Sequence, residues 1–190
     1  MYKAKILALG PCKSGKTAIC NFLSDATESM NSEYHSTRGV RILEFEVPNV
    51  PIGGGRMSNC EVELWDVSGD TRFENCWPAI ARDVHGVMFV FNPGQPHCEK
   101  HLQNWYNYFV GQNNLKDSQC VSFAHHKDPN ENRDDPRLPK ELSKIPCIHT
   151  NLDEESEELR SEFQNFLSSI LAGIVEKREQ EELNIMNDRH

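Results

Sequence analysis

The chain has 190 residues, 37% of them hydrophobic, so it is long enough to build one domain with a full-sized core. Its formal net charge of −9 leaves no basic stripe that could displace counterions from phosphates, so we expect no nucleic-acid partner. The seven cysteines are odd in number and show no C-x-x-C spacing, which is typical of reduced thiols and not of a disulfide framework or a zinc site.

Strands and helices alternate along the first third of the chain. An apolar run before the first glycine predicts a buried strand, and apolar residues at helical spacing follow the glycine-rich stretch. The predicted elements are, in order, a strand at 3–9, a helix ending near 24–25, a polar loop at 26–37, a half-exposed strand at 41–47, a flexible glycine-rich turn at 48–59 and a strand at 60–66. The last two strands are expected to pair as an antiparallel hairpin at the sheet edge.

The remainder of the chain continues the alternation. It predicts a partly helical segment at 71–84, a buried strand at 86–92, a helix with an aromatic stripe at 102–110, a strand at 119–125, a charged loop at 127–144, a short strand at 145–149, an amphipathic helix over 159–175 and a charged tail at 176–190. This order predicts an α/β domain over residues 1–175, with a six-stranded, mostly parallel sheet covered by helices on both faces.

A phosphate-binding motif lies between the first strand and the first helix. Residues 10–17 fit the pattern G-x-x-x-x-G-K-[ST] without a mismatch, and the residues assigned to nucleotide binding here are Gly10, Pro11, Cys12, Lys13, Ser14, Gly15, Lys16, Thr17 and Ala18. Glycines let the backbone N–H groups wrap a polyphosphate at the helix N-terminus. We expect Lys16 to reach the phosphates and the Thr17 hydroxyl to bind Mg²⁺.

Two further loops fit the same site. Asp66 closes the third strand and is expected to hold Mg²⁺ through water, and Gly69 three residues later offers an N–H group to a γ-phosphate. Upstream, Thr37 is placed to complete the Mg²⁺ shell while a γ-phosphate is present. Two loops that sense one phosphate group predict a switch that can order and disorder.

These motifs, in this order and spacing, resemble the Rab/Ras-type small GTPases over about residues 3–175. A narrower set resembles the Rab-like GTPase subunits of intraflagellar transport complex B; it comprises residues 41–46, 73–79 and 124–127. The resemblance implies GTP or GDP with Mg²⁺ as ligands and coiled-coil subunits of complex B as partners. It also implies a location in the cilium or flagellum, the basal body and the cytoplasm, and a protein that is monomeric on its own.

The chain departs from the general GTPase pattern at the position of the water-orienting glutamine, where it has Asp70. A carboxylate beside the γ-phosphate adds negative charge, so Asp70 is a weak catalytic candidate. Cys12 stands where many relatives have glycine and is expected to crowd the same place. We therefore expect slow or undetectable hydrolysis.

The motif that reads guanine is also altered. Where relatives carry Asn-Lys-x-Asp, this chain has His125, His126, Lys127 and Asp128, and we expect Asp128 to accept hydrogen bonds from the base. Thr150 and Asn151 offer a further base contact. The alternative is that residues 125–128 are ordinary surface loop residues, so the preference for guanine comes from the resemblance.

Three other functions compete with the switch. A catalytically competent Rab-type GTPase of vesicle trafficking would use the same site with efficient hydrolysis. A small-molecule kinase would need an arginine-bearing lid, and the insertion at 127–144 carries only Arg133 and Arg137. A Rab that cycles on membranes would need a lipid anchor. No apolar run approaches the roughly 18 residues of a membrane span, and the last residues contain no cysteine to prenylate, so we expect no direct membrane anchor.

Overall fold

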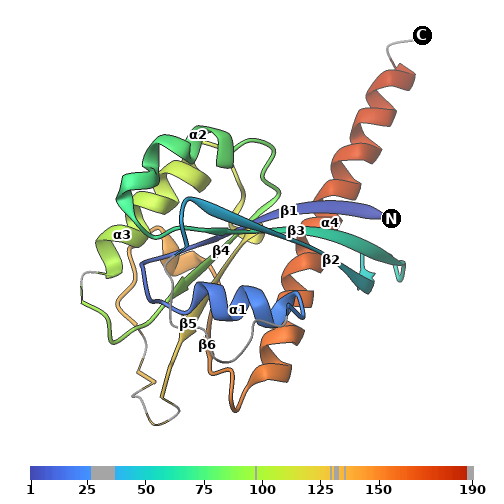
Figure 1. Cartoon of the computed structure of the whole chain (residues 1–190). Coiled ribbons are helices and arrows are strands. Elements are labelled where there is room, and N and C mark those ends of the chain that lie inside the picture. Colours follow the sequence, from blue (N-terminus) through green and yellow to red (C-terminus); the bar gives the residue numbers. More distant parts are fainter. Residues whose placement is uncertain (27–36, 97, 129, 131–132, 135, 188–190) are drawn as a thin grey trace.

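The computed structural model describes residues 1–26, 37–96, 98–128, 130, 133–134 and 136–187. Six strands form one sheet in the order β2-β3-β1-β4-β5-β6, where β2 is antiparallel to β3 and the other neighbouring strands are parallel (Figure 1). The strands are β1 (Tyr2–Leu9), β2 (Val40–Pro51), β3 (Met57–Val67), β4 (Gly86–Phe91), β5 (Cys120–His125) and β6 (Cys147–Thr150). The predicted fold class is confirmed.

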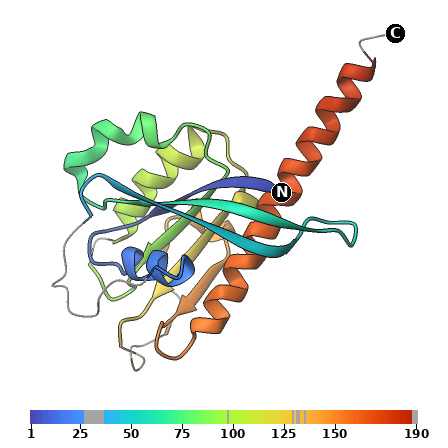
Figure 2. The same ribbon diagram turned by 45° about the vertical axis from the view of Figure 1, so that its right-hand side comes forward.

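Helices cover both faces of this sheet (Figures 1 and 2). They are α1 (Lys16–Leu23), α2 (Trp77–Ile80), α3 (Cys98–Trp105) and α4 (Ser156–Asn187), with shorter helical turns η1 (Thr71–Cys76), η2 (Tyr106–Gly111), η3 (Asp117–Gln119) and η4 (Leu142–Lys144). Successive side chains of a strand point to opposite faces, so β1 contributes to two separate cores. Ile6 and Ala8 pack in the core with α1 and α4, whereas Leu7 and Leu9 pack in the core with α2 and α3.

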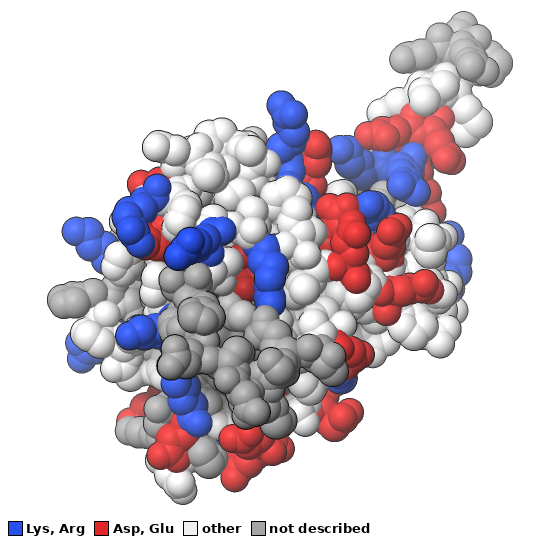
Figure 3. Space-filling model, in the orientation of Figure 1, with Lys and Arg blue, Asp and Glu red and all other residues white. Residues whose placement is uncertain are grey.

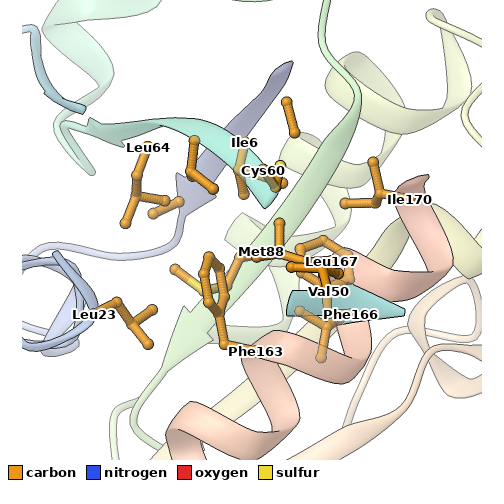
Figure 4. Close-up of a cluster of buried hydrophobic side chains, with 14 of the residues drawn as sticks. Ile6, Leu23, Val50, Cys60, Leu64, Met88, Phe163, Phe166, Leu167 and Ile170 are labelled. Carbon is orange, nitrogen blue, oxygen red and sulfur yellow. The ribbon is translucent and has the colours of Figure 1, made fainter. Parts of the chain in front are cut away.

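The core between the sheet, α1 and α4 is built from buried aliphatic and aromatic groups. Figure 4 shows Ile6, Leu64 and Met88 from the strands meeting Leu23 of α1 and the Phe163 and Leu167 side chains of α4. On the opposite face, the aromatic stripe predicted at 102–110 is core: Trp105 and Phe109 are buried. Trp77 packs on Phe109 with ring centroids 5.1 Å apart, so this tryptophan belongs to the fold.

The hairpin of β2 and β3 is longer than predicted. The segment 48–59, expected to be a flexible turn, is mostly strand, because β2 runs to Pro51 and β3 begins at Met57. Side chains of α4 hold it: Gln164 donates to the Asn49 carbonyl at 3.3 Å and Ser168 to the Pro51 carbonyl at 2.7 Å. Local turn signals were therefore overridden by contacts with a helix far away in sequence.

The last helix also continues beyond the predicted end at residue 175. Its C-terminal part stands away from the body (Figure 1), and contacts near its base fix the first turns of this extension. Arg178 lies over the Tyr2 ring at 5.2 Å, and Arg56 of the hairpin turn pairs with Glu179 at 3.3 Å. Within the described residues, no helix combines the length and apolar character needed to cross a bilayer.

Acidic side chains gather over the hairpin region of the molecule (Figure 3). The register places Glu44 opposite Glu63 and Glu46 opposite Glu61. Like charges directly opposite one another destabilise a strand pair, and Lys3 offsets one of them through its ion pair with Glu63 at 2.7 Å.

Candidate nucleotide-binding site

The phosphate loop joins the carboxyl end of β1 to the first residue of α1. Its two glycines are required by close approaches: a Cβ atom at Gly10 would lie 1.8 Å from the Val90 carbonyl oxygen, and one at Gly15 would lie 2.3 Å from the His125 ring. Gly15 also has a φ of 94°, in the left-handed region that favours glycine. The loop is therefore held tightly between β4 and the end of β5.

Lys16 is buried inside the loop. Its ammonium group donates to the carbonyl oxygens of Gly10 and Pro11, each at 2.7 Å. Burial lowers the pKa of Lys16 from its usual value, and the nearby Asp66 carboxylate acts in the opposite direction. A phosphate group placed in the loop would supply the negative charge that this buried cation favours.

The three residues predicted to hold Mg²⁺ lie together. The Thr17 hydroxyl donates to Asp66 Oδ2 at 2.7 Å, the Thr37 hydroxyl donates to the same oxygen at 3.3 Å, and the two hydroxyls are 3.2 Å apart. Asp66 is completely buried, and its Oδ1 atom has no hydrogen-bond partner among the described residues. The Arg41 guanidinium lies 3.7 Å from Oδ2, so one carboxylate oxygen is paired and, within the described residues, Oδ1 is the oxygen without a partner. That oxygen and the two hydroxyls suit Mg²⁺, which prefers hard oxygen donors and retains several waters. These residues therefore fit the ion.

The two loops predicted to sense the γ-phosphate contact each other and the phosphate loop. The N–H of Ser68 donates to the Gly39 carbonyl at 2.8 Å, which ties the segment after Thr37 to the segment after Asp66. A Cβ atom at Gly69 would lie 2.4 Å from the Cys12 nitrogen and 2.6 Å from the Gly10 oxygen. Only a glycine lets this segment approach the loop so closely.

Asp70 has a structural partner of its own. Its carboxylate caps η1 by accepting from the Arg72 N–H at 2.9 Å, and it also forms an ion pair with the Arg72 guanidinium at 2.6 Å. The hydrogen bonds from Arg72 lower the pKa of Asp70. The negative charge that we expect to slow hydrolysis is thus partly balanced by a neighbour.

The base end of the site is built from histidines. His125 packs on Gly15, and its Nδ1 atom lies 3.3 Å from the Thr150 hydroxyl. His126 is buried and stacks on His149, with ring centroids 5.1 Å apart and a hydrogen bond of 2.9 Å between the two rings. Asn151 donates to the His126 carbonyl at 3.0 Å, so the segments that follow β5 and end β6 are joined here.

The other two residues of the predicted base motif point elsewhere. Lys127 and Asp128 are exposed, and the Asp128 carboxylate accepts from the backbone and side-chain amides of Asn130 at 2.9 and 3.1 Å. The structure therefore brings His125, His126, Thr150 and Asn151 together, while Asp128 is engaged in a local turn.

Two side chains at the site were missed by sequence reasoning. Gln95, in the segment after β4, donates its side-chain amide to the Cys12 carbonyl of the phosphate loop at 3.1 Å. Arg72 binds Asp70 as described. Neither belongs to a spacing motif, and no sequence signal distinguishes them from other polar residues in loops.

Comparison with known proteins identifies the domain family to which this chain is similar. The domain family described as Ras of Complex, Roc, domain of DAPkinase matches residues 5–128, more than half of the chain. The phosphate-loop motif and the six-stranded sheet are thus those of a Ras-related GTPase domain.

Relatives that match nearly the whole chain identify a particular family within the Ras-related GTPases. The chain is 47% identical to the intraflagellar transport protein 22 homolog of Danio rerio and 46% identical to that of Homo sapiens; each match covers 98% of this chain and 100% of the relative. A crystal structure of GTP-bound T. brucei IFT22/74/81 superposes with a TM-score of 0.75 at 33% identity, covering 93% of this chain and 99% of that one. A GDP-bound structure of T. brucei IFT22 gives a TM-score of 0.68 at 32% identity, covering 90% and 98%. The chain belongs to the intraflagellar transport protein 22 family, as the resemblance predicted.

Proposed function

We propose that this chain is a nucleotide-dependent switch or adaptor of intraflagellar transport that binds GTP and GDP together with Mg²⁺. The observation that carries the proposal is the convergence of Thr17, Thr37 and Asp66 beside the buried Lys16 ammonium. Relatives in the same family have been crystallised in GTP-bound and GDP-bound forms, which supports the choice of ligand.

The roles of the individual residues follow from their positions. Backbone N–H groups of residues 10–18 and the Lys16 ammonium hold the phosphates, while Thr17, Thr37 and, through water, Asp66 hold the ion. When bound, Mg²⁺ neutralises phosphate charge. Gly69 contacts the γ-phosphate with its N–H group. We assign the base contacts to six residues. His125, His126, Thr150 and Asn151 already lie together, whereas Lys127 and Asp128 are exposed, and Asp128 reaches the base only when its contact with Asn130 opens.

Nucleotide occupancy is tested directly on purified protein. Nucleotide extracted from the protein and separated by chromatography should be GTP or GDP, and titration of the nucleotide-free protein should show binding that depends on Mg²⁺. Absence of affinity for guanine nucleotides in the presence of magnesium would overturn the proposal.

The partners are the coiled-coil subunits of complex B. The chain is a monomer that this machinery carries to the cilium or flagellum, and its other locations are the basal body and the cytoplasm. The IFT22/74/81 crystal structure of the T. brucei relative supports a partner of this kind. We expect Thr17→Asn and Lys16→Ala to weaken capture of the chain's own counterparts of these subunits, because both empty the pocket. Equal capture by wild type and both variants would instead identify a nucleotide-independent scaffold.

Hydrolysis is proposed to be slow or negligible, so that occupancy and not turnover carries the signal. Asp70, the weak catalytic candidate, has an anionic carboxylate that is committed to Arg72 and the η1 cap. Phosphate release by wild type should be no faster than release by Asp70→Ala. Clearly faster release by wild type would identify a competent GTPase.

A further inference from the structure

Three successive carbonyl groups of the phosphate loop are held by two different side chains. The Gly10 and Pro11 oxygens accept from the Lys16 ammonium inside the loop. The next oxygen, that of Cys12, accepts from the Gln95 amide, which comes from the segment after β4. The carbonyl group of Cys12 thus points toward Gln95, whereas the two preceding carbonyl groups point toward Lys16.

The Gln95 amide is dedicated to this contact. Its Nε2 atom lies 3.1 Å from the Cys12 oxygen, and its Oε1 atom is buried without a hydrogen-bond partner among the described residues. Rotating the amide would bring two oxygens together, so the orientation with the N–H group facing the loop is fixed by chemistry. Gln95 is half-buried, and the Cys12 carbonyl is the one hydrogen-bond partner of its side chain within the described residues.

A trans peptide has its C=O and N–H groups on opposite sides, and no described peptide is cis. When Gln95 holds the Cys12 carbonyl outward, the N–H of Lys13 must face the opposite way, toward the space that the loop encloses. In this arrangement Lys13 has a φ of 61°, in the left-handed region that a residue with a side chain rarely occupies. The strained residue, Lys13, therefore follows the peptide whose carbonyl group is bound by the Gln95 side chain.

We propose that Gln95 is a positioning residue for nucleotide binding: its amide keeps the Cys12–Lys13 peptide turned so that the Lys13 N–H is preset for a phosphate oxygen. This inference rests on the proposed function, since it concerns the same pocket. The proposed role of Gln95 differs from a general stabilising role because Gln95 acts through the orientation of one peptide. A substitution that relieves the strain at Lys13 should therefore restore the nucleotide affinity lost with Gln95.

The test measures dissociation constants for GTP and GDP with Mg²⁺ on nucleotide-free protein. Gln95→Met keeps the size of the side chain but removes the donor, and it should weaken both nucleotides about five- to tenfold. Gln103→Met, on α3, removes an exposed glutamine whose contacts with Glu141 are 3.4 and 3.5 Å, and it should leave both constants unchanged. Thermal unfolding of each variant separates a binding effect from a loss of fold.

A rescue experiment makes the test specific. Lys13→Gly and Lys13→Ala remove the same exposed amine, but only glycine adopts the left-handed conformation without strain. In the Gln95→Met background, Lys13→Gly should restore affinity about threefold or more relative to Lys13→Ala. Equal affinity of Gln95→Met and wild type, or equal affinity of the two double variants, would overturn the role of Gln95 while leaving the proposed function intact. Failure of wild type itself to bind would overturn both.

Discussion

The phosphate end and the base end of this pocket are built in different ways. At the phosphate end, buried groups converge: Lys16 and Asp66 are enclosed, and Thr17 joins Asp66 by a short hydrogen bond. At the base end, His126 is buried and stacks on the half-buried His149, but Asp128 is exposed and bound to Asn130. The proposed phosphate contacts are therefore already arranged in the fold, whereas the proposed contact between Asp128 and guanine requires the local turn of Asp128 to rearrange.

This difference shows why affinity and base selectivity should respond separately to mutation. Charge-assisted hydrogen bonds in a buried site are the strong ones, and they lie at the phosphate end. The exposed Asp128 carboxylate should contribute less to the affinity, because water competes for its hydrogen bonds. The comparison makes four predictions, in order of decreasing effect.

Lys16→Ala should have the largest effect. It removes the ammonium group that we propose meets the phosphates. It also leaves the Gly10 carbonyl without its side-chain donor, and the Pro11 carbonyl with only the Ser14 N–H at 3.4 Å. Affinity for GTP and GDP should fall about a hundredfold, or about 2.8 kcal/mol. Titration with a fluorescent guanine nucleotide measures this change, with Lys140→Ala, an exposed lysine outside the proposed site, as the control. A loss below tenfold would contradict the buried role of Lys16.

Thr17→Val tests the ion site. The substitution preserves shape but removes the hydroxyl that bonds to Asp66, so Mg²⁺-dependent affinity should fall about thirtyfold. Removal of Mg²⁺ with a chelator should weaken wild type by a similar factor and add little to the loss in the variant. Independent, additive losses would mean that Thr17 does not act through the ion.

Gly69→Ala tests how closely the switch segment approaches the loop. The added Cβ would overlap backbone atoms of Cys12 and Gly10, so we expect a loss of about 1.5–2 kcal/mol in the free energy of unfolding, measured by urea denaturation. Gly173→Ala in α4 is the control, since nothing lies within 4 Å of the added atom, and it should be neutral or stabilising. Similar stability of both variants would show that the segment moves away freely.

Asp128→Asn should have the smallest effect on GTP. We expect about a fivefold loss, because an exposed hydrogen bond is replaced, together with a gain in affinity for xanthine nucleotides, whose base offers an acceptor to the new amide. Paired titrations with the two nucleotides measure the ratio. Unchanged affinity for both would show that Asp128 does not contact the base and is an ordinary surface loop residue, whereas His125 and His126 are buried in either case.

Much of the fold could be predicted because the central strands are short apolar runs and β2 alternates apolar and charged residues. The buried faces of the helices carry apolar residues that recur at helical spacing. The hairpin was predicted too short because Pro48 and the three glycines at 53–55 are strong turn signals, and the side chains that oppose them come from α4. At the phosphate end, Lys16, Thr17 and Asp66 were identified by motif spacing. Gln95 and Arg72 could not be, since their roles come from contacts that only the folded chain creates.

The extension of α4 bears on where this domain can be cut. The apolar stripe ends at Val175, yet Arg178 covers the ring of Tyr2 at the start of β1, and Glu179 anchors the tip of the hairpin through Arg56. A chain shortened at the last buried residue would uncover the first strand and release the hairpin tip. A truncation that keeps these contacts must therefore end after Glu179. The hydrophobic pattern does not show this boundary, because charged side chains make the contacts.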